Sequence, residues 1–111
     1  MFRFSRGLVA ALALGACLAG CAPSKPRAPQ TFQIVVDKMA FGPAPVDLHV
    51  GDTVQWVNRD MFQHSATSKT GDFDVELPPG VTGSAVMKQG GTILYNCRYH
   101  PDMKGQLSVT P

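Results

Sequence analysis

Short stretches in which apolar and polar residues alternate recur through most of the chain, and turn residues separate them. Residues 46–50 alternate cleanly, so Val46, Leu48 and Val50 are expected to face inward and His49 to face water. The predicted strands are residues 31–37, 46–50, 53–58, 73–77, 81–88, 92–98 and 106–110. Outside the first 20 residues, no window longer than ten residues has a helical period.

Frequent turn residues support the same fold class. The chain of 111 residues contains 11 glycines and 9 prolines, which argues against long helices. Seven or eight short strands, with a turn every eight to twelve residues, predict an all-β sandwich. The other side chains expected to face inward are Phe32, Ile34, Val36, Val54, Trp56, Ile93, Tyr95, Cys97, Leu107 and Val109.

The first 20 residues have the pattern of a bacterial signal peptide. Two arginines precede an uncharged apolar run over residues 7–20, which is too short to span a membrane as a helix. The run ends in Leu-Ala-Gly-Cys21, which resembles the lipobox of bacterial lipoproteins, so we expect cleavage before Cys21 and acylation of its thiol. The alternative is an ordinary signal cleaved near Ala22, with Cys17 and Cys21 lost.

Residues 21–30 are predicted to be a lipidated cysteine and a proline-rich tether, because residues 22–30 read APSKPRAPQ and offer little to bury. Residues 31–111 are then the single folded domain. This domain carries six basic and eight acidic residues, so it lacks the basic surface of a nucleic-acid-binding protein. We expect no nucleic-acid partner, a location in the bacterial periplasm or cell envelope, and a membrane-anchored monomer.

Cysteine usage points to a metal. If Cys17 and Cys21 are removed or acylated, Cys97 is left alone and no internal disulfide can form. A domain of about 80 residues often needs a disulfide or a metal to be stable. Metal ligation is one of the few explanations for such a lone thiol in an exported protein.

The residues around Cys97 suit copper better than zinc. Cys97, His100 and Met103 lie at a spacing of three and three, on a loop with Pro101 after the histidine. A tetrahedral zinc site would need another strong ligand in place of the thioether. One thiolate, two imidazoles and a distant thioether are the ligands of a blue-copper site, so a second histidine is required. We choose His64, which follows the 53–58 strand in a predicted loop, over His49 in the middle of a strand.

Several segments together closely resemble the cupredoxins, the type 1 copper proteins. They are Gly51-Asp52-Thr53-Val54-Gln55-Trp56-Val57-Asn58-Arg59-Asp60, then His64, and Gly91-Thr92-Ile93-Leu94-Tyr95-Asn96-Cys97 with the loop to Met103. The Cys-x2-His-x2-Met loop and the Trp-Val-Asn-Arg segment are most similar to amicyanin and other plastocyanin-type domains. The resemblance implies a Greek-key sandwich and one type 1 copper ion. It implies binding through Nδ1 of His64 and His100, Sγ of Cys97 and Sδ of Met103.

Two positions depart from the family pattern. Ser65 stands where most of these families have an asparagine that fastens the two ligand loops. Its backbone N–H can still donate to the Cys97 sulfur, as the family's does, which makes Ser65 a residue of the surrounding shell. Arg98 stands where a threonine or serine usually follows the ligand cysteine. Copper binding is expected to survive both changes, with altered potential and loop rigidity.

The ligand set predicts a one-electron carrier rather than an enzyme, because it leaves no open position for a substrate and no general base is evident. Electrons would pass through the edge of the His100 ring to redox partner proteins, and Phe62, Met61 and Pro101 would form a small apolar docking patch. Two alternatives remain: an envelope protein that delivers or sequesters copper, and a metal-free adhesive or scaffold sandwich.

Overall fold

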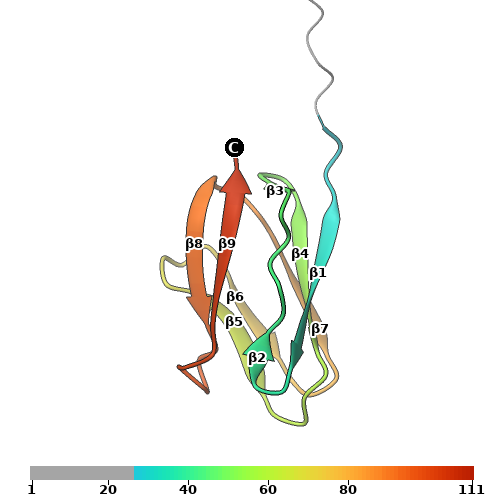
Figure 1. The fold of residues 1–111 in the computed structure, drawn as a ribbon, viewed down its shortest axis with the longest axis vertical. Coiled ribbons are helices and arrows are strands. Elements are labelled where there is room, and N and C mark those ends of the chain that lie inside the picture. The colour runs from blue at the N-terminus through green and yellow to red at the C-terminus, as the bar shows by residue number, and fades with distance from the viewer. Residues whose placement is uncertain (1–26) are drawn as a thin grey trace, which may run out of the picture.

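The computed structural model describes residues 27–111, which form nine strands in two sheets (Figure 1). One sheet has the order β2-β1-β4-β7 and the other has β3-β9-β8-β5-β6. The strands are β1 (Thr31–Asp37), β2 (Ala40–Phe41), β3 (Leu48–His49), β4 (Thr53–Asn58), β5 (His64–Ser68), β6 (Asp74–Leu77), β7 (Thr82–Val86), β8 (Gly91–Asn96) and β9 (Lys104–Thr110). The predicted all-β sandwich is confirmed, with nine strands instead of seven or eight because β2 and β5 gave no clear sequence signal.

The predicted signal peptide, Cys21 and residues 22–26 of the predicted tether lie outside the described residues. Within residues 27–111, no helix has the length and apolar character needed to cross a bilayer.

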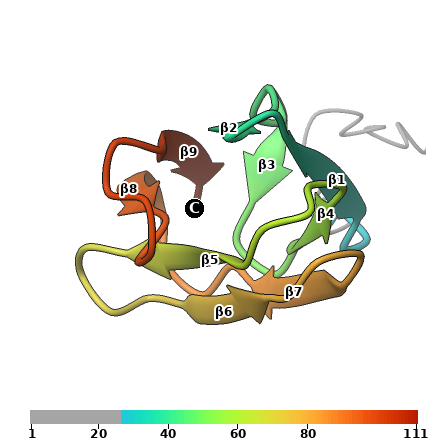
Figure 2. The same ribbon diagram turned by 90° about the horizontal axis from the view of Figure 1, so that it is seen from below.

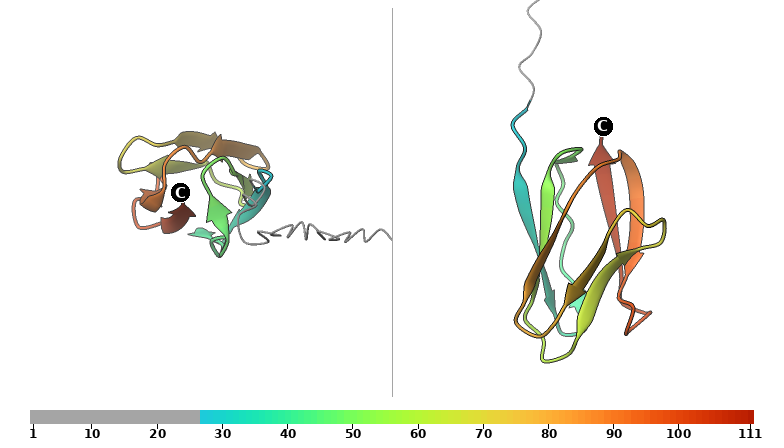
Figure 3. Two further views of the ribbon diagram at one scale, coloured as in Figure 1. Left: turned by 90° about the horizontal axis from the view of Figure 1, so that it is seen from above. Right: turned by 180° about the vertical axis from the view of Figure 1, so that it is seen from behind.

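The strands surround one interior, as the view from below shows (Figure 2). β1 pairs with β4 in parallel and β3 pairs with β9 in parallel, whereas the other pairings are antiparallel. The edge strands β6 and β7 of the two sheets lie side by side in the view from behind (Figure 3). The chain therefore crosses between the sheets several times, and loops distant in sequence meet at each end.

The alternation prediction fails for Val46 and Val50. Both side chains are exposed, and Val46 is fully so, while Leu48 between them is buried. The β3 strand pairs with β9 only at Leu48 and His49. Pro43 and Pro45 precede it and cannot donate to a ladder, and Val50 already belongs to the turn at Gly51, so neither valine lies on a regular pleat.

The β5 strand escaped prediction because its buried side chains are small or polar. His64, Ser65, Ala66 and Ser68 are all buried, so the segment shows no apolar alternation. His64, predicted to lie in a loop, is the first residue of this strand.

A cluster of aromatic rings fills the interior between the sheets. The Trp56 Nε1–H donates to the Tyr95 hydroxyl at 3.3 Å, and both side chains are buried. Phe41 and Phe73 pack against the Tyr95 ring with centroid distances of 4.7 and 5.7 Å. Gly105 lies opposite Tyr95 in the β8–β9 pairing, and a Cβ at this glycine would overlap the Tyr95 ring. The absence of a side chain on Gly105 thus allows Tyr95 to lie across β9.

Asp52 joins the beginning of the described chain to the end of the sandwich where β4 starts. Its buried carboxylate accepts hydrogen bonds from the backbone N–H groups of Gln30 and His49 at 2.8 and 2.9 Å. The Arg27 guanidinium donates to both carboxylate oxygens at 2.9 Å. Two residues of the predicted tether are thereby attached to the domain.

We predict that Gly105→Ala lowers the free energy of unfolding of the metal-free protein by about 1–3 kcal/mol, because the new methyl group must displace the Tyr95 ring. Urea unfolding measures this change. Ser108→Ala, at an exposed position of the same strand, is the control and should stay within about 0.5 kcal/mol of the wild type. Equal stability of Gly105→Ala and the wild type would contradict the packing.

Candidate metal centre

Three of the four predicted ligands meet at one end of the sandwich. His64 begins β5, Cys97 directly follows β8, and His100 lies in the loop between β8 and β9 (Figure 1). The Cys97 Sγ lies 3.7 Å from Nδ1 of His64 and 3.6 Å from Nδ1 of His100. One donor atom from each of the three residues lies within 4.8 Å of the others. His64 and Cys97 are buried, and His100 is half-buried.

The β8–β9 loop holds Cys97 and Met103 on opposite sides of a narrow hairpin. The Cys97 N–H donates to the Met103 carbonyl at 3.0 Å, which extends the pairing of β8 with β9. The Met103 N–H donates to the His100 carbonyl at 2.9 Å, which closes the turn. Met103 is only 5% exposed and lines a shallow cavity beside His100. Its backbone position and burial suit the predicted thioether ligand.

A carboxylate that sequence reasoning missed sets the tautomer of His64. Asp60 Oδ2 lies 2.8 Å from Nε2 of His64. The backbone N–H groups of Met39 and Lys38 also donate to this carboxylate, at 2.9 and 2.7 Å. The pKa of Asp60 is lowered from 3.8 to about 2, chiefly by the hydrogen bond from Met39 and further by those from His64 and Lys38. Burial of the carboxylate opposes this shift. An ionised Asp60 can only accept, so Nε2 carries the proton and the Nδ1 lone pair faces Cys97.

Lys38 and Met39 form a tight turn between β1 and β2 in the left-handed region, with φ of 52° and 61°. This conformation is costly for residues other than glycine, and the two hydrogen bonds to Asp60 stabilise it. The only sequence signal for the role of Asp60 was its place four residues before the candidate ligand His64.

Ser65 contacts the ligand loop through its side chain. Its Oγ accepts a hydrogen bond of 2.8 Å from the backbone N–H of Arg98, the residue after Cys97. The link between the two ligand segments, which the replacement of asparagine by serine put in question, is therefore present. His49, the histidine not chosen as a ligand, lies at the other end of the sandwich beside Asp52.

Apolar side chains surround the exposed edge of His100. The Phe62 ring lies 6.4 Å from the His100 ring, between centroids, at an interplanar angle of 70°. Phe62 is 55% exposed, Met61 is 85% exposed, and Pro101 is exposed beside the histidine. The three residues predicted for docking are thus accessible, and Phe62 and Pro101 lie next to His100.

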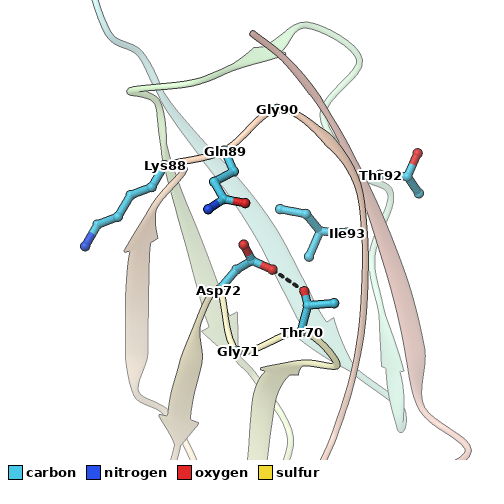
Figure 4. A pocket seen from close by; sticks show the side chains of 8 residues that line it. All are labelled: Thr70, Gly71, Asp72, Lys88, Gln89, Gly90, Thr92 and Ile93. Atoms are coloured by element: carbon cyan, nitrogen blue, oxygen red, sulfur yellow. Dashed lines mark hydrogen bonds between the residues drawn. The ribbon is translucent and has the colours of Figure 1, made fainter.

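A second hollow lies away from the candidate ligands. It is lined by the β5–β6 turn and the segment before β8, and Thr70 donates to Asp72 within it (Figure 4). Lys88 and Gln89 border it, and none of the predicted ligands does.

The spacing of the donor atoms fits a first-row transition metal. With bonds of about 2.3 Å to sulfur and 2.0–2.1 Å to nitrogen, angles from tetrahedral to trigonal separate the two donors by about 3.5–3.8 Å. The two Sγ–Nδ1 distances of 3.7 and 3.6 Å lie within this range. One thiolate and two imidazoles, with a thioether on the same loop, match copper better than zinc.

Comparison with known proteins places the chain in a family. The family described as "Cupredoxin-like domain" matches residues 10–109. The chain belongs to the cupredoxin family. Amicyanin from Paracoccus denitrificans is 32% identical to this cupredoxin in an alignment 93 positions long, and the match covers 68% of this chain. That match spans 64% of the length of amicyanin, slightly less than two thirds.

Solved structures of amicyanin variants resemble this cupredoxin as well. An oxidised methionine-to-leucine variant has a TM-score of 0.63 at 26% identity, over 70% of this chain and 80% of the other. The Cu(I) form of a methionine-to-alanine variant has a TM-score of 0.60 at 27% identity, over 76% and 86% of the two chains. The predicted family is confirmed, and His64, Cys97 and His100 form its candidate copper site.

We predict that Asp60→Asn flattens the acid dependence of stability in the metal-free protein. The pKa of Asp60 is lower in the folded protein, so its carboxylate stabilises the fold above its ordinary value of 3.8. That contribution is lost as the pH falls toward a pKa of about 2. Unfolding measured between about pH 5 and pH 2 should therefore show a shallower slope for the variant than for the wild type.

Asp102→Asn is the matched control, because it removes an exposed carboxylate of the ligand loop that has no hydrogen-bond partner among residues 27–111. The control should keep the wild-type slope. An Asp60→Asn slope equal to that of the wild type would show that Asp60 is not held as the structure describes.

Proposed function

We propose that this cupredoxin is a type 1 copper protein that carries single electrons, with His64, Cys97, His100 and Met103 as ligands. The observation that carries the proposal is the approach of two imidazole Nδ1 atoms to one buried Cys97 sulfur, at 3.7 and 3.6 Å. When bound, copper would supply the change between Cu(II) and Cu(I). The protein's part is to keep these donors in one arrangement for both oxidation states.

The structure around the ligands supports such an arrangement. Cys97 and Met103 are joined by a backbone hydrogen bond across the hairpin, and Asp60 orients His64. Tyr95, two residues before Cys97, is packed in the core. Ligands on such supports would move little if a bound metal changed charge, and a small rearrangement favours rapid electron transfer. We assign electron transfer and no catalytic activity, because the Met103 thioether would complete the ligand set and leave no place for a substrate.

His100 is the proposed point of electron exchange, because it is the only one of the three clustered donors that is accessible to solvent. A redox partner would approach this end of the sandwich and cover Phe62, Met61 and Pro101. Apolar surface around a half-exposed ligand lets a partner exclude water there without removing charged groups from solvent.

We also propose that the protein is a monomeric lipoprotein of the bacterial cell envelope, anchored through Cys21. The β1 strand begins at the end of the sandwich opposite the ligand loop (Figure 1). An anchor on that side would direct His100 away from the membrane and toward a partner. Arg27 and Gln30 are bound to Asp52, so only residues 22–26 would separate the anchor from the attached part of the chain.

We predict an intense blue colour when Cu(II) is added, because a thiolate in a trigonal copper site donates charge to the metal. Cys97→Ser should abolish the colour. His49→Ala, which removes a histidine at the other end of the sandwich, should keep it. A colourless wild-type complex would contradict the type 1 site, and loss of the metal on each redox cycle would favour copper delivery or sequestration.

We predict that the full-length precursor, expressed in a bacterium, fractionates with membranes and that Cys21→Ser releases it. Immunoblots of membrane and soluble fractions test this. Cys17→Ser is the matched control and should remain with the membrane, because Cys17 precedes the expected cleavage site. Recovery of the wild type in the soluble fraction would refute the anchor without affecting the proposed copper chemistry.

A further inference from the structure

A chain of polar side chains on one face of β5 and β6 leads away from the ligand loop. The Arg98 N–H donates to Ser65 Oγ at 2.8 Å, and Ser65 Oγ lies 2.9 Å from Thr67 Oγ1. Thr67 Oγ1 donates in turn to Asp74 Oδ1 at 2.9 Å. Ser65 and Thr67 are two residues apart on one strand, and Asp74 faces Thr67 across the β5–β6 pairing, so all three lie on the same face of the sheet.

The hydrogen bonds in this chain can run in only one direction. An ionised Asp74 only accepts, so the single hydroxyl hydrogen of Thr67 is used toward it. The Ser65 hydroxyl must then donate to Thr67, which leaves a Ser65 lone pair for the Arg98 N–H. Asp74 thereby fixes the direction of the hydrogen on the buried Ser65 hydroxyl, away from the Arg98 N–H that donates to the same oxygen.

The side chain of Arg98 returns to the same carboxylate. Its guanidinium is ion-paired with Asp74 and with Glu76, the next outward residue of β6. The Tyr99 hydroxyl donates to Glu76 at 2.8 Å, and the Gln63 side chain donates to Glu76 at 3.0 Å. The arginine is 42% exposed, so its ion pairs alone add little to stability. Their effect is geometric, because they close a ring from the Arg98 backbone through Ser65, Thr67 and Asp74 back to Arg98.

We propose that this ring of hydrogen bonds keeps the Cys97 sulfur at a fixed position relative to the His64 imidazole. The positioning residues for the metal centre are then Ser65, Thr67, Asp74 and Arg98. Ser65 follows His64 and Arg98 follows Cys97, so their hydrogen bond joins the two ligand segments one residue away from the ligands. The ring does here what an asparagine side chain does in the related families. The proposal rests on the proposed function and deepens it. The hydrogen bond from the Arg98 N–H to Ser65 does not require a bound metal.

The first test uses the metal-free protein, so that it stands whether or not copper binds. Hydrogen exchange of the Arg98 amide, followed by NMR, should show protection in the wild type. Thr67→Val removes the hydroxyl but keeps the shape of the side chain, and it should raise the Arg98 exchange rate about threefold to tenfold, the loss expected for one net hydrogen bond. Thr67→Ser, which keeps the hydroxyl, should retain the protection.

An unprotected Arg98 amide in the wild type would overturn the proposal. So would equal exchange in Thr67→Val and Thr67→Ser, because Ser65 would then accept from Arg98 without the help of Thr67 and Asp74. Thr67 is half-buried at the edge of the ring, so both variants should fold, and circular dichroism verifies this.

The second test uses the copper-loaded protein. Thr67→Val and Arg98→Met should each weaken copper binding about tenfold and move the visible absorption bands, as changes around metal ligands do. Because both act through Asp74, their effects should not add in the double variant. Lys104→Met is the matched control, since it also removes an exposed cation directly after a ligand, in this case Met103, and it should leave the bands in place.

Additive effects, or an equal band shift in Lys104→Met, would show that Arg98 acts through its charge alone and would overturn the ring. If copper gives no blue complex at all, the proposed function fails, while the hydrogen-exchange result still decides whether the ring positions Arg98.

Discussion

The confinement of one sulfur and two imidazole nitrogens within 4.8 Å of one another is the constraint on which this structure depends. Two of the three residues are fully buried. The Cys97 sulfur carries at most one hydrogen, a weak donor that can serve only one of the two Nδ1 atoms at a time, so direct attraction within the metal-free cluster is small. The surrounding protein must supply the free energy that keeps them together. The three candidate ligands are accordingly held by contacts within the protein. His64 is bound to Asp60, Cys97 to the Met103 carbonyl, and the His100 carbonyl accepts a hydrogen bond from the Met103 N–H. The Cys97 neighbour Arg98 is bound to Ser65.

The core beneath the site explains why these attachments hold one geometry. Cys97 continues β8, whose register with β9 places Tyr95 over Gly105. The Tyr95 ring is wedged among Trp56, Phe41 and Phe73, so β8 cannot slide without displacing a large buried side chain. A shift of one residue would also turn Cys97 out of the interior. The position of the Cys97 sulfur along β8 therefore follows from the packing of the Tyr95 side chain, two residues earlier. The hydrogen bonds of the ligand loop then fix its position relative to His64.

Sequence reasoning succeeded where the physical signal was local. The bounds of β1 and β4 follow from clean alternation. Spacing on one loop singled out Cys97 and His100, which the structure brings together with His64, and it predicts Met103 as a further ligand. It failed where tertiary contacts decide the outcome. The β5 strand buries polar and small side chains, which only the neighbouring strands can satisfy. Asp60 gave no sign of its role beyond its place four residues before His64, because its donors, Lys38 and Met39, come from a turn more than 20 residues earlier. The Ser65–Thr67–Asp74 chain likewise exists only once β5 and β6 pair.

The two ends of the sandwich use a carboxylate in the same way but balance its charge differently. Asp52 accepts two backbone N–H groups and is paired with the Arg27 guanidinium, so its charge is neutralised where it lies. Asp60 also accepts two backbone N–H groups, yet within residues 27–111 no Lys or Arg side chain is paired with it, and the His64 imidazole donates to it. The negative charge of Asp60 is therefore directed through that ring toward the metal position. A nearby anion stabilises a doubly charged ion more than a singly charged one, so Asp60 would favour the oxidised state of the proposed copper site. The residue that sets the tautomer of His64 would thus also lower the reduction potential of that site.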